Sequence, residues 1–303
     1  MKLKSRLGRI RHRARGFLRW AADELPKAPR AELYARRIDH HNAFLTQHLR
    51  AGGAEAFAWY SRDYLHRDIP KVVWTFWNGG EASAPPVVRR CIESWRLHNP
   101  GWDVRVLDDA AVSEVVDLSD VPAGVPVRVR GNFLKLRLTS RYGGVWADST
   151  TLCHRPLDEW IPLLAGQTGF FVFGGPYKDR WVDNWFIAAH PDNPIIHRWH
   201  DAYVDHVRRL GRVPSKYFMM IYILQSALRD DEDLMDEYRR SGRLPAVPCF
   251  LLQAWLEGKS PLPAFQDARR RGLPLSKLNW KVATEAEALD EALRTAGIPL
   301  YPA

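Results

Sequence analysis

Residues 142–150, Tyr-Gly-Gly-Val-Trp-Ala-Asp-Ser-Thr, constrain the fold of this chain more than any other segment. An apolar helix predicted over 132–141 runs directly into the glycine pair, and glycine can adopt the positive φ angles that reverse a chain sharply after a helix. The valine and tryptophan that follow favour a short buried strand. That strand delivers the carboxylate of Asp148 to its carboxyl end, where α/β sheets bind their ligands. A carboxylate there can hold Mn²⁺ or Mg²⁺, and such a cation stabilises a diphosphate leaving group.

Strands and helices alternate around this motif. The apolar run 71–76 predicts a strand, the segment from Ser83 to Asn99 a helix with prolines in its first turn, and 103–107 a second strand. This order implies a parallel α/β sheet. Later, 169–173 and 184–189 are typical of buried strands, and the apolar spacing over 194–210 predicts a helix. Neither a Gly-X-Gly-X-X-Gly nor a Walker loop is present, so the sequence does not support a dinucleotide or P-loop fold.

Five short motifs occur in order at 69–77, 94–100, 104–109, 142–148 and 155–158. In these segments the chain resembles the capsular polysaccharide synthesis glycosyltransferases, relatives of retaining sugar transferases that have a GT-A fold and an Asp-X-Asp motif. Similarity continues more weakly through 183–189 and 276–281. The resemblance implies a GT-A-like nucleotide-sugar-binding domain over 67–303, with a mixed, mostly parallel central sheet flanked by helices.

The chain departs from the wider family at three positions. Thr150 stands where the second Asp of Asp-X-Asp would be, although capsular members often have threonine there. Asp148 and Thr150 are therefore the predicted metal ligands, with metal dependence open. On the preceding helix, Asn132 and Lys135 replace an Asp and an Arg, and lysine lacks the bidentate fork of arginine. These two side chains and Thr139 share one helix face, which either borders the site of Asp148 or is solvated.

The resemblance assigns further residues to the donor site. Trp77 either packs on the nucleotide base or belongs to the core, and Gly144 is grouped with the donor-binding residues. Asn184 is expected to contact the donor sugar or a phosphate, whereas Asp183 is either a second carboxylate near the anomeric carbon or a strand-end cap. Lys277 and Lys281 either neutralise the leaving diphosphate, in a loop that folds over it, or lie in a solvated basic turn.

The net charge of +9 comes almost entirely from residues 1–20, which contain eight Lys or Arg and no acidic residue. Apolar residues recur there at helical spacing, which favours a basic amphipathic helix at an anionic membrane surface. A solvated basic arm and a nucleic-acid-binding arm are the alternatives, and no recognition motif supports nucleic acid as a partner. We divide the chain into this arm (1–30), a helical segment (31–66) and the domain at 67–303.

Three widely spaced cysteines exclude a disulfide framework and a zinc cluster, and they fit a reducing cytoplasm. The sequence contains neither a secretory signal nor a spanning apolar stretch. We therefore expect a cytoplasmic protein, peripheral at the inner face of the membrane. The resemblance implies a glycosyltransferase of capsular or cell-surface polysaccharide synthesis, which moves a sugar from a nucleoside diphosphate donor to a glycan or lipid-linked acceptor, with retention if the family's chemistry applies. The alternative is a non-catalytic relative that binds a nucleotide sugar or glycan and regulates polysaccharide assembly.

Overall fold

The computed structural model describes residues 67–122, 124–177, 180–210, 216–281 and 285–299. The predictions for the basic arm and for the helical segment 31–66 lie outside these residues. Within them, the structure contains no helix that is both long and apolar enough to cross a membrane.

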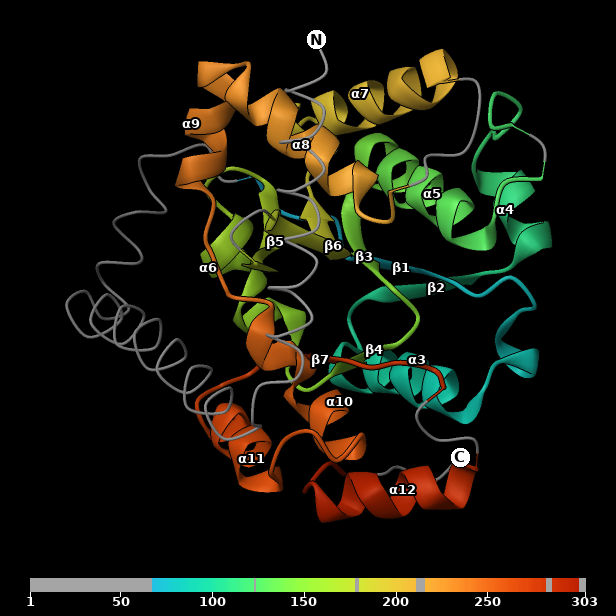
Figure 1. Ribbon diagram of the computed structural model, residues 1–303, viewed down its shortest axis with the longest axis vertical. Coiled ribbons are helices and arrows are strands. Elements are labelled where there is room, and N and C mark those ends of the chain that lie inside the picture. Colours follow the sequence, from blue (N-terminus) through green and yellow to red (C-terminus); the bar gives the residue numbers. More distant parts are fainter. Residues whose placement is uncertain (1–66, 123, 178–179, 211–215, 282–284, 300–303) are drawn as a thin grey trace, which may run out of the picture.

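A five-stranded sheet in the order β2-β1-β3-β6-β5 forms the centre of the domain (Figure 1). Neighbours β2, β1 and β3 are parallel, and β6 is antiparallel to both β3 and β5. Because β5 pairs antiparallel with β6, it runs in the direction of the first three strands, and β6 alone is reversed. The predicted mixed, mostly parallel sheet is therefore confirmed. The strands span Val72–Phe76 (β1), Asp103–Leu107 (β2), Gly144–Ala147 (β3), Phe170–Tyr177 (β5) and Arg180–Ala189 (β6).

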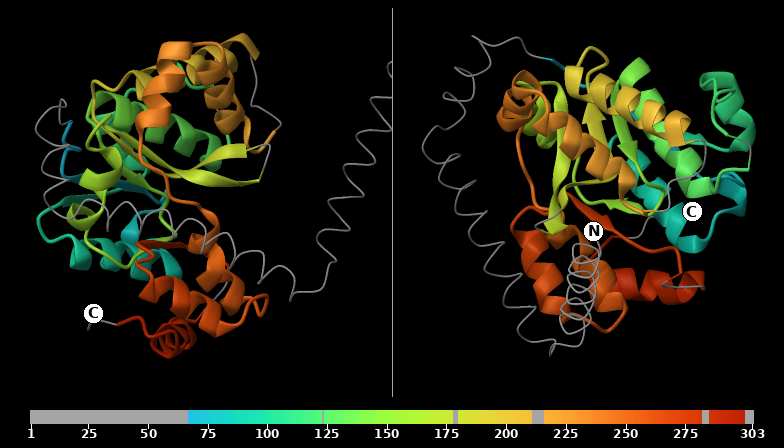
Figure 2. Two further views of the ribbon diagram at one scale, coloured as in Figure 1. Left: turned by 90° about the vertical axis from the view of Figure 1, so that its left-hand side faces the viewer. Right: turned by 45° about the horizontal axis from the view of Figure 1, so that its top comes forward.

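Helices cover both faces of the sheet (Figure 2). One layer contains α5 (Val127–Arg141), α7 (Pro194–Leu210), α8 (Met219–Arg229) and α9 (Glu232–Arg240). The other contains α3 (Pro86–His98), α10 (Leu251–Leu256), α11 (Leu262–Arg270) and α12 (Ala286–Thr295), together with a two-stranded ribbon of β4 (Thr151–Cys153) and β7 (Leu275–Lys277). The remaining short elements are α4 (Asp109–Val115), α6 (Ile161–Ala165) and the 3₁₀ turns Glu81–Ser83, Leu157–Glu159 and Val247–Phe250.

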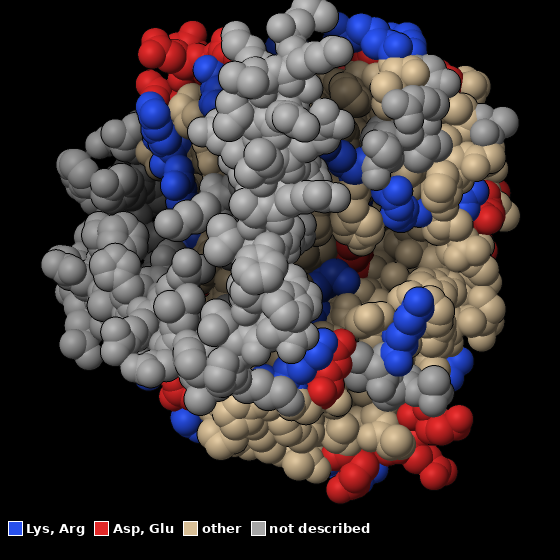
Figure 3. Space-filling model, viewed as in Figure 1, with Lys and Arg blue, Asp and Glu red and all other residues tan. Residues whose placement is uncertain are grey.

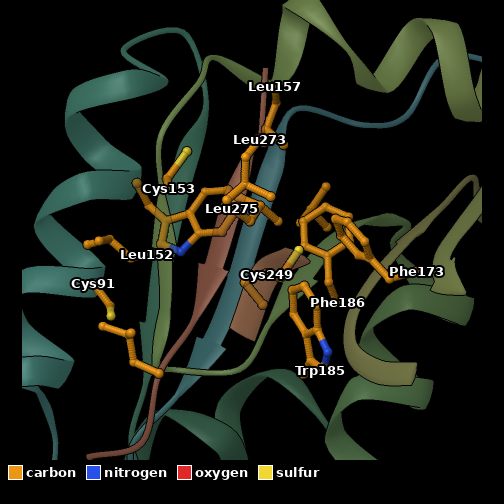
Figure 4. Packing of buried hydrophobic residues seen from close by; sticks show 14 of the residues in the cluster. Cys91, Leu152, Cys153, Leu157, Phe173, Trp185, Phe186, Cys249, Leu273 and Leu275 are labelled. Carbon is orange, nitrogen blue, oxygen red and sulfur yellow. The ribbon is translucent and has the colours of Figure 1, made fainter. Parts of the chain in front are cut away.

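Alternate residues of the central strands pack into two separate cores. Val73 and Val145 face the layer of α3 and α10, and Trp74 and Trp146 face the layer of α5 and α7. This period of two on a sheet buried on both faces explains why the strands are apolar throughout. Figure 4 shows the first core, with Phe173, Trp185 and Phe186 grouped together. The three cysteines are buried free thiols.

The strand at 103–107 and the helix at 194–210 have the predicted bounds. Strand β1 and helix α3 are slightly shorter than expected, whereas α5, β5 and β6 are longer. Helix α5 begins at Val127 rather than at residue 132, because Pro126 precedes its first turn and Val129 is buried. Strand β6 begins at Arg180 rather than at residue 184, because it continues as a hairpin with β5, with Gly174 opposite Val182. Backbone pairing between β5 and β6 thus extends these two strands beyond their most apolar residues.

Candidate active site

The predicted site residues gather where β1 and β3 end, beside the middle of β6. Asp148 directly follows β3, and its backbone N–H donates to the carbonyl of Trp185 on β6 at 2.8 Å. Trp77 directly follows β1, the parallel neighbour of β3. The carboxyl ends of parallel strands meet at one edge of a sheet, so the fold itself brings these side chains together. Figure 3 shows a hollow in this face of the molecule, between the positions of α5 and α12, in which acidic and basic side chains lie next to each other.

The glycine pair makes the turn from α5 into β3 as predicted. Gly143 and Gly144 have φ angles of 66° and 91°, a region that disfavours residues with a Cβ atom. At Gly144 a Cβ would lie 2.4 Å from Val72 Cγ1 on β1. The structure thus gives Gly144 a packing role, and its assignment to donor binding stays a prediction.

Lys135, on α5, forms an ion pair with Asp148. Its Nζ lies 3.0 Å from Asp148 Oδ1 and 3.1 Å from the carbonyl of Asn184, and its side chain is 5% exposed. Trp146 Nε1 donates to the same carboxylate oxygen at 2.8 Å. Burial alone would raise the pKa of Asp148, but Lys135, Lys277 and the indole donor lower it below its ordinary value. Lys135 therefore belongs to the site, and the solvated helix face expected as the alternative is wrong for this residue.

Lys277 approaches the site from the opposite layer. Strand β7 pairs antiparallel with β4, with Lys277 opposite Thr151, and the N–H of Leu278 donates to the carbonyl of Thr150 at 2.8 Å. This ladder places Lys277 Nζ 2.5 Å from Thr150 Oγ1 and 3.0 Å from the carbonyl of Leu278. Burial lowers the pKa of Lys277, although the charge of Asp148 partly opposes that shift. Lys277 thus lies in a paired strand, and the solvated basic turn is wrong for it. Lys281 lies exposed in the turn that follows, in agreement with that alternative.

Asp183 lies inside β6, not at its end, so the strand-cap alternative is wrong. Its side chain is buried, accepts from the N–H of Asn184 at 3.1 Å and lies 3.7 Å from Arg180 Nη2. Burial is the main cause of its raised pKa, and the charge of Asp148 adds to it. The side chain of Asn184 is half-buried, and its amide contacts Met220 Sδ on α8 at 3.4 Å.

Two tryptophans lie side by side at the rim. Trp77 packs partly against α3 and meets Trp280 edge to face, with ring centroids 6.2 Å apart. Trp280 is 45% exposed, and the ammonium of Lys281 lies 5.2 Å from its ring centroid. Trp280 lies in the motif 276–281 but was not among the site residues predicted from the sequence. Arg180 was not predicted either, because it lies outside the strand expected at 184–189.

Asn132 and Thr139 are not at the centre of this group. Asn132 Nδ2 donates to the hydroxyl of Tyr203 on α7 at 3.3 Å. Thr139 is fully buried, and its hydroxyl donates to the carbonyl of Lys135 in its own helix. Lys135 is therefore the residue of this helix face for which the structure gives a direct contact with Asp148.

A divalent cation at Asp148 and Thr150 stays a prediction, and the surrounding groups do not favour it. Among the described residues, no group of three or more His, Cys, Asp or Glu side chains could hold a metal ion. The oxygens of Asp148 and Thr150 accept hydrogen bonds from the ammonium groups of Lys135 and Lys277. Mg²⁺ and Mn²⁺ prefer several oxygen ligands and carboxylate charge, which this donor set lacks.

Comparison with known proteins identifies the same family that the motifs resemble. The family model described as "Capsular polysaccharide synthesis protein" matches residues 34–294, which is most of the chain. The chain belongs to this family. The resemblance inferred from the motifs is therefore confirmed. The match includes the β4–β7 ribbon and the C-terminal helices of this capsular synthesis family member, as well as its central sheet.

Curated relatives match a shorter stretch. An O-glycosyltransferase, braB of Annulohypoxylon truncatum, is 33% identical over 151 residues, 43% of this chain and 36% of its own length. Glycosyltransferase afumC of Aspergillus fumigatus is 33% identical over 153 residues, 43% of this chain and 39% of its own. The initiation-specific alpha-1,6-mannosyltransferase of Schizosaccharomyces pombe is 27% identical over 158 residues, 43% of this chain and 38% of its own. The chain thus spans less than half the length of these relatives.

A solved structure titled "PaToxG Glycosyltransferase" aligns with 89% of this chain and 95% of its own, with a TM-score of 0.41 and 12% identity. A score this low does not establish a shared fold.

Proposed function

We propose that this protein is a glycosyltransferase that moves a sugar from a nucleoside diphosphate donor to a hydroxyl group of a glycan or lipid-linked acceptor. One observation carries the proposal: two ammonium groups, of Lys135 and Lys277, flank the single carboxylate of Asp148 where parallel strands end. Such a cationic edge suits a diphosphate, whose charge grows as the sugar departs. The names of the matching relatives, an O-glycosyltransferase and a mannosyltransferase among them, support the same reaction class.

From the positions of the side chains, we propose which part of the donor each one contacts. The diphosphate lies between Lys135 and Lys277, and the base packs against the pair of Trp77 and Trp280 at the rim. Asp148 accepts a hydrogen bond from the ribose or the sugar, and Asn184 contacts a sugar hydroxyl. In this GT-A-like arrangement Lys281, beside Trp280, faces the same ligand from outside.

Transfer with retention needs no separate base in this site. The acceptor oxygen forms a bond to the anomeric carbon on the face from which the diphosphate leaves. The bond from that carbon to the phosphate oxygen breaks, and its electron pair goes to the diphosphate. The leaving oxygen takes the proton of the acceptor hydroxyl. The protein contributes positioning and electrostatic stabilisation.

Release of nucleoside diphosphate from a panel of UDP-, GDP-, ADP- and CDP-sugars tests this function. We expect the wild-type protein to act on one donor. In Asp148→Asn the rate of nucleoside diphosphate release should fall at least about 100-fold, the scale at which preorganised groups contribute to catalysis. Asp236→Asn, at an exposed ion pair with Arg239, is the matched control and should act as wild type.

The alternative, a non-catalytic relative that binds donor or glycan, is motivated by Thr150 and Lys135, which stand where wider relatives have Asp and Arg. Turnover separates the two functions. Donor binding that depends on Asp148, without release or transfer in the presence of any acceptor tested, would favour the regulatory role.

Contact with an anionic membrane through residues 1–20 belongs to the same proposal, because lipid-linked acceptors lie at a membrane surface. Their charge and helical periodicity support it. Deletion of residues 1–25 should release the protein from phosphatidylserine vesicles, and unchanged sedimentation with them would contradict the membrane contact.

A further inference from the structure

We propose that this site binds its diphosphate without a divalent cation, and that the ammonium of Lys277, together with that of Lys135, supplies the positive charge. This inference rests on the proposed function and names how the same site neutralises its ligand. It departs from the cation expected from the sequence.

The position of Lys277 is fixed by backbone structure. Strands β4 and β7 pair from Thr151 with Lys277 to Cys153 with Leu275, and the following residue continues the ladder through the carbonyl of Thr150. The side chain of Ser276 between these residues is fully buried, so the ribbon is anchored in the core. Its register cannot slip without moving every side chain to the other face. Lys277 therefore faces Thr150 because of the fold and not by a chance surface rotamer.

Lys277 donates to the hydroxyl that stands at the second position of the acidic motif. Its Nζ lies 2.5 Å from Thr150 Oγ1. A pair of carboxylates with a divalent cation sums to zero charge, and so does one carboxylate with one ammonium. Replacing a carboxylate by Thr150 and the cation by Lys277 thus keeps the charge at this edge. An added divalent ion would lie beside two ammonium groups, and the motif at 148–150 supplies Asp148 as its one carboxylate.

The charged groups around Asp148 carry an excess of positive charge that an anion could neutralise. Among the described residues of this cluster, the cations Lys135, Lys277 and Arg180 outnumber the carboxylates Asp148 and Asp183 by one. An excess of positive charge in a partly buried site is costly unless an anion compensates it. A diphosphate provides that compensation, whereas a further cation increases the excess.

Calorimetric titration with UDP, GDP, ADP and CDP, each in EDTA and in Mn²⁺, tests the inference on the whole protein. We expect one nucleotide to bind, with dissociation constants in the two conditions within about twofold of each other. Lys277→Met keeps the length of the side chain and removes its charge, so it should weaken binding in EDTA by about tenfold or more, the value of one charged hydrogen bond. Lys259→Ala, at an exposed ion pair with Glu257, is the control.

A second variant tests the replacement itself. Thr150→Asp combined with Lys277→Ala restores two carboxylates and removes the ammonium, so binding should become dependent on Mn²⁺. Thermal melting shows whether each variant is folded, and the comparison of EDTA with Mn²⁺ on wild-type protein needs no variant. Binding of the wild type only with Mn²⁺, or undiminished binding by folded Lys277→Met in EDTA, would overturn the inference and leave the proposed function standing. No binding of any nucleotide in either condition would overturn both.

Discussion

Lys135 and Asp148 form a partly buried ion pair, 3.0 Å from Nζ to Oδ1, across a chain reversal that separates them by only 13 residues. This contact is fixed by local structure: the last turns of α5, the turn at Gly143, and the short strand β3. Because Lys135 also donates to the carbonyl of Asn184, it joins α5, β3 and β6 at the candidate active site. The pair thus serves both to position the carboxylate and to present a positive charge.

Removing the charge of Lys135 should therefore affect both the ligand and the carboxylate. In Lys135→Met, we expect binding of the nucleoside diphosphate to weaken by about tenfold or more. The pKa of Asp148 should rise, because the lysine is a main cause of its lowered value. Titration calorimetry and the pH dependence of binding measure the two effects. Unchanged affinity in a folded Lys135→Met protein would remove this residue from the donor site.

Trp280 should contribute to nucleotide affinity from the rim. Stacking of a base on an aromatic ring is worth about 1–3 kcal/mol, so Trp280→Ala should weaken binding by roughly 5- to 150-fold. Trp280→Phe keeps a ring that can contact Trp77, so its nucleotide affinity should fall much less. Quenching of tryptophan fluorescence by the nucleotide reports the binding. Equal affinities of the Ala and Phe variants would show that the ring at this position is not a base platform.

The motif with Asp148 was predictable because its chemistry is local: a helix, two glycines and a short apolar strand specify where the carboxylate lies. The contact with Lys135 follows from the same local geometry. Lys277 was named from the sequence, but its partner was not, because 127 residues separate it from Thr150 and only the β4–β7 pairing joins them. Trp280 was not predicted as a site residue, because tertiary packing and not sequence periodicity places it beside Trp77.

The neutral state of His154 should make stability fall with acid. Its ring is buried, with Nε2 2.8 Å from Ser276 Oγ, and burial lowers its pKa from 6.5 to about 3. The unfolded chain takes up this proton below pH 6.5 and the folded protein does not, so this contribution is present above pH 6.5 and is lost as pH falls towards about 3.

Between pH 7.5 and 5.5, wild-type protein should therefore lose about 1.4 kcal/mol more unfolding free energy than His154→Gln, which keeps a hydrogen-bonding group near Ser276. Urea denaturation at the two pH values measures this difference. His197→Gln, on the exposed side of α7, should follow the wild type. A His154→Gln slope equal to that of the wild type would show that this histidine does not remain neutral in the folded state.

Two glycines near the site should respond oppositely to alanine. Gly144 has a φ of 91° and no space for a Cβ beside Val72, so Gly144→Ala should destabilise the fold by about 2–5 kcal/mol. Gly131, inside α5, has open space where a methyl group would lie, so Gly131→Ala should stabilise the fold by about 0.5–1 kcal/mol. Equal melting temperatures of the two variants would contradict the packing role of Gly144.

The most direct test of the proposed donor site is a crystal structure of the protein with the nucleotide that calorimetry selects. We expect the diphosphate within hydrogen-bonding distance of Lys135 and Lys277, and the base against Trp77 and Trp280. A separate pocket lies at the opposite edge of the sheet, where Lys71 precedes β1 and Arg67 and Trp102 contribute to its lining. A nucleotide bound in that pocket, with the edge at Asp148 left without ligand, would contradict the central claim.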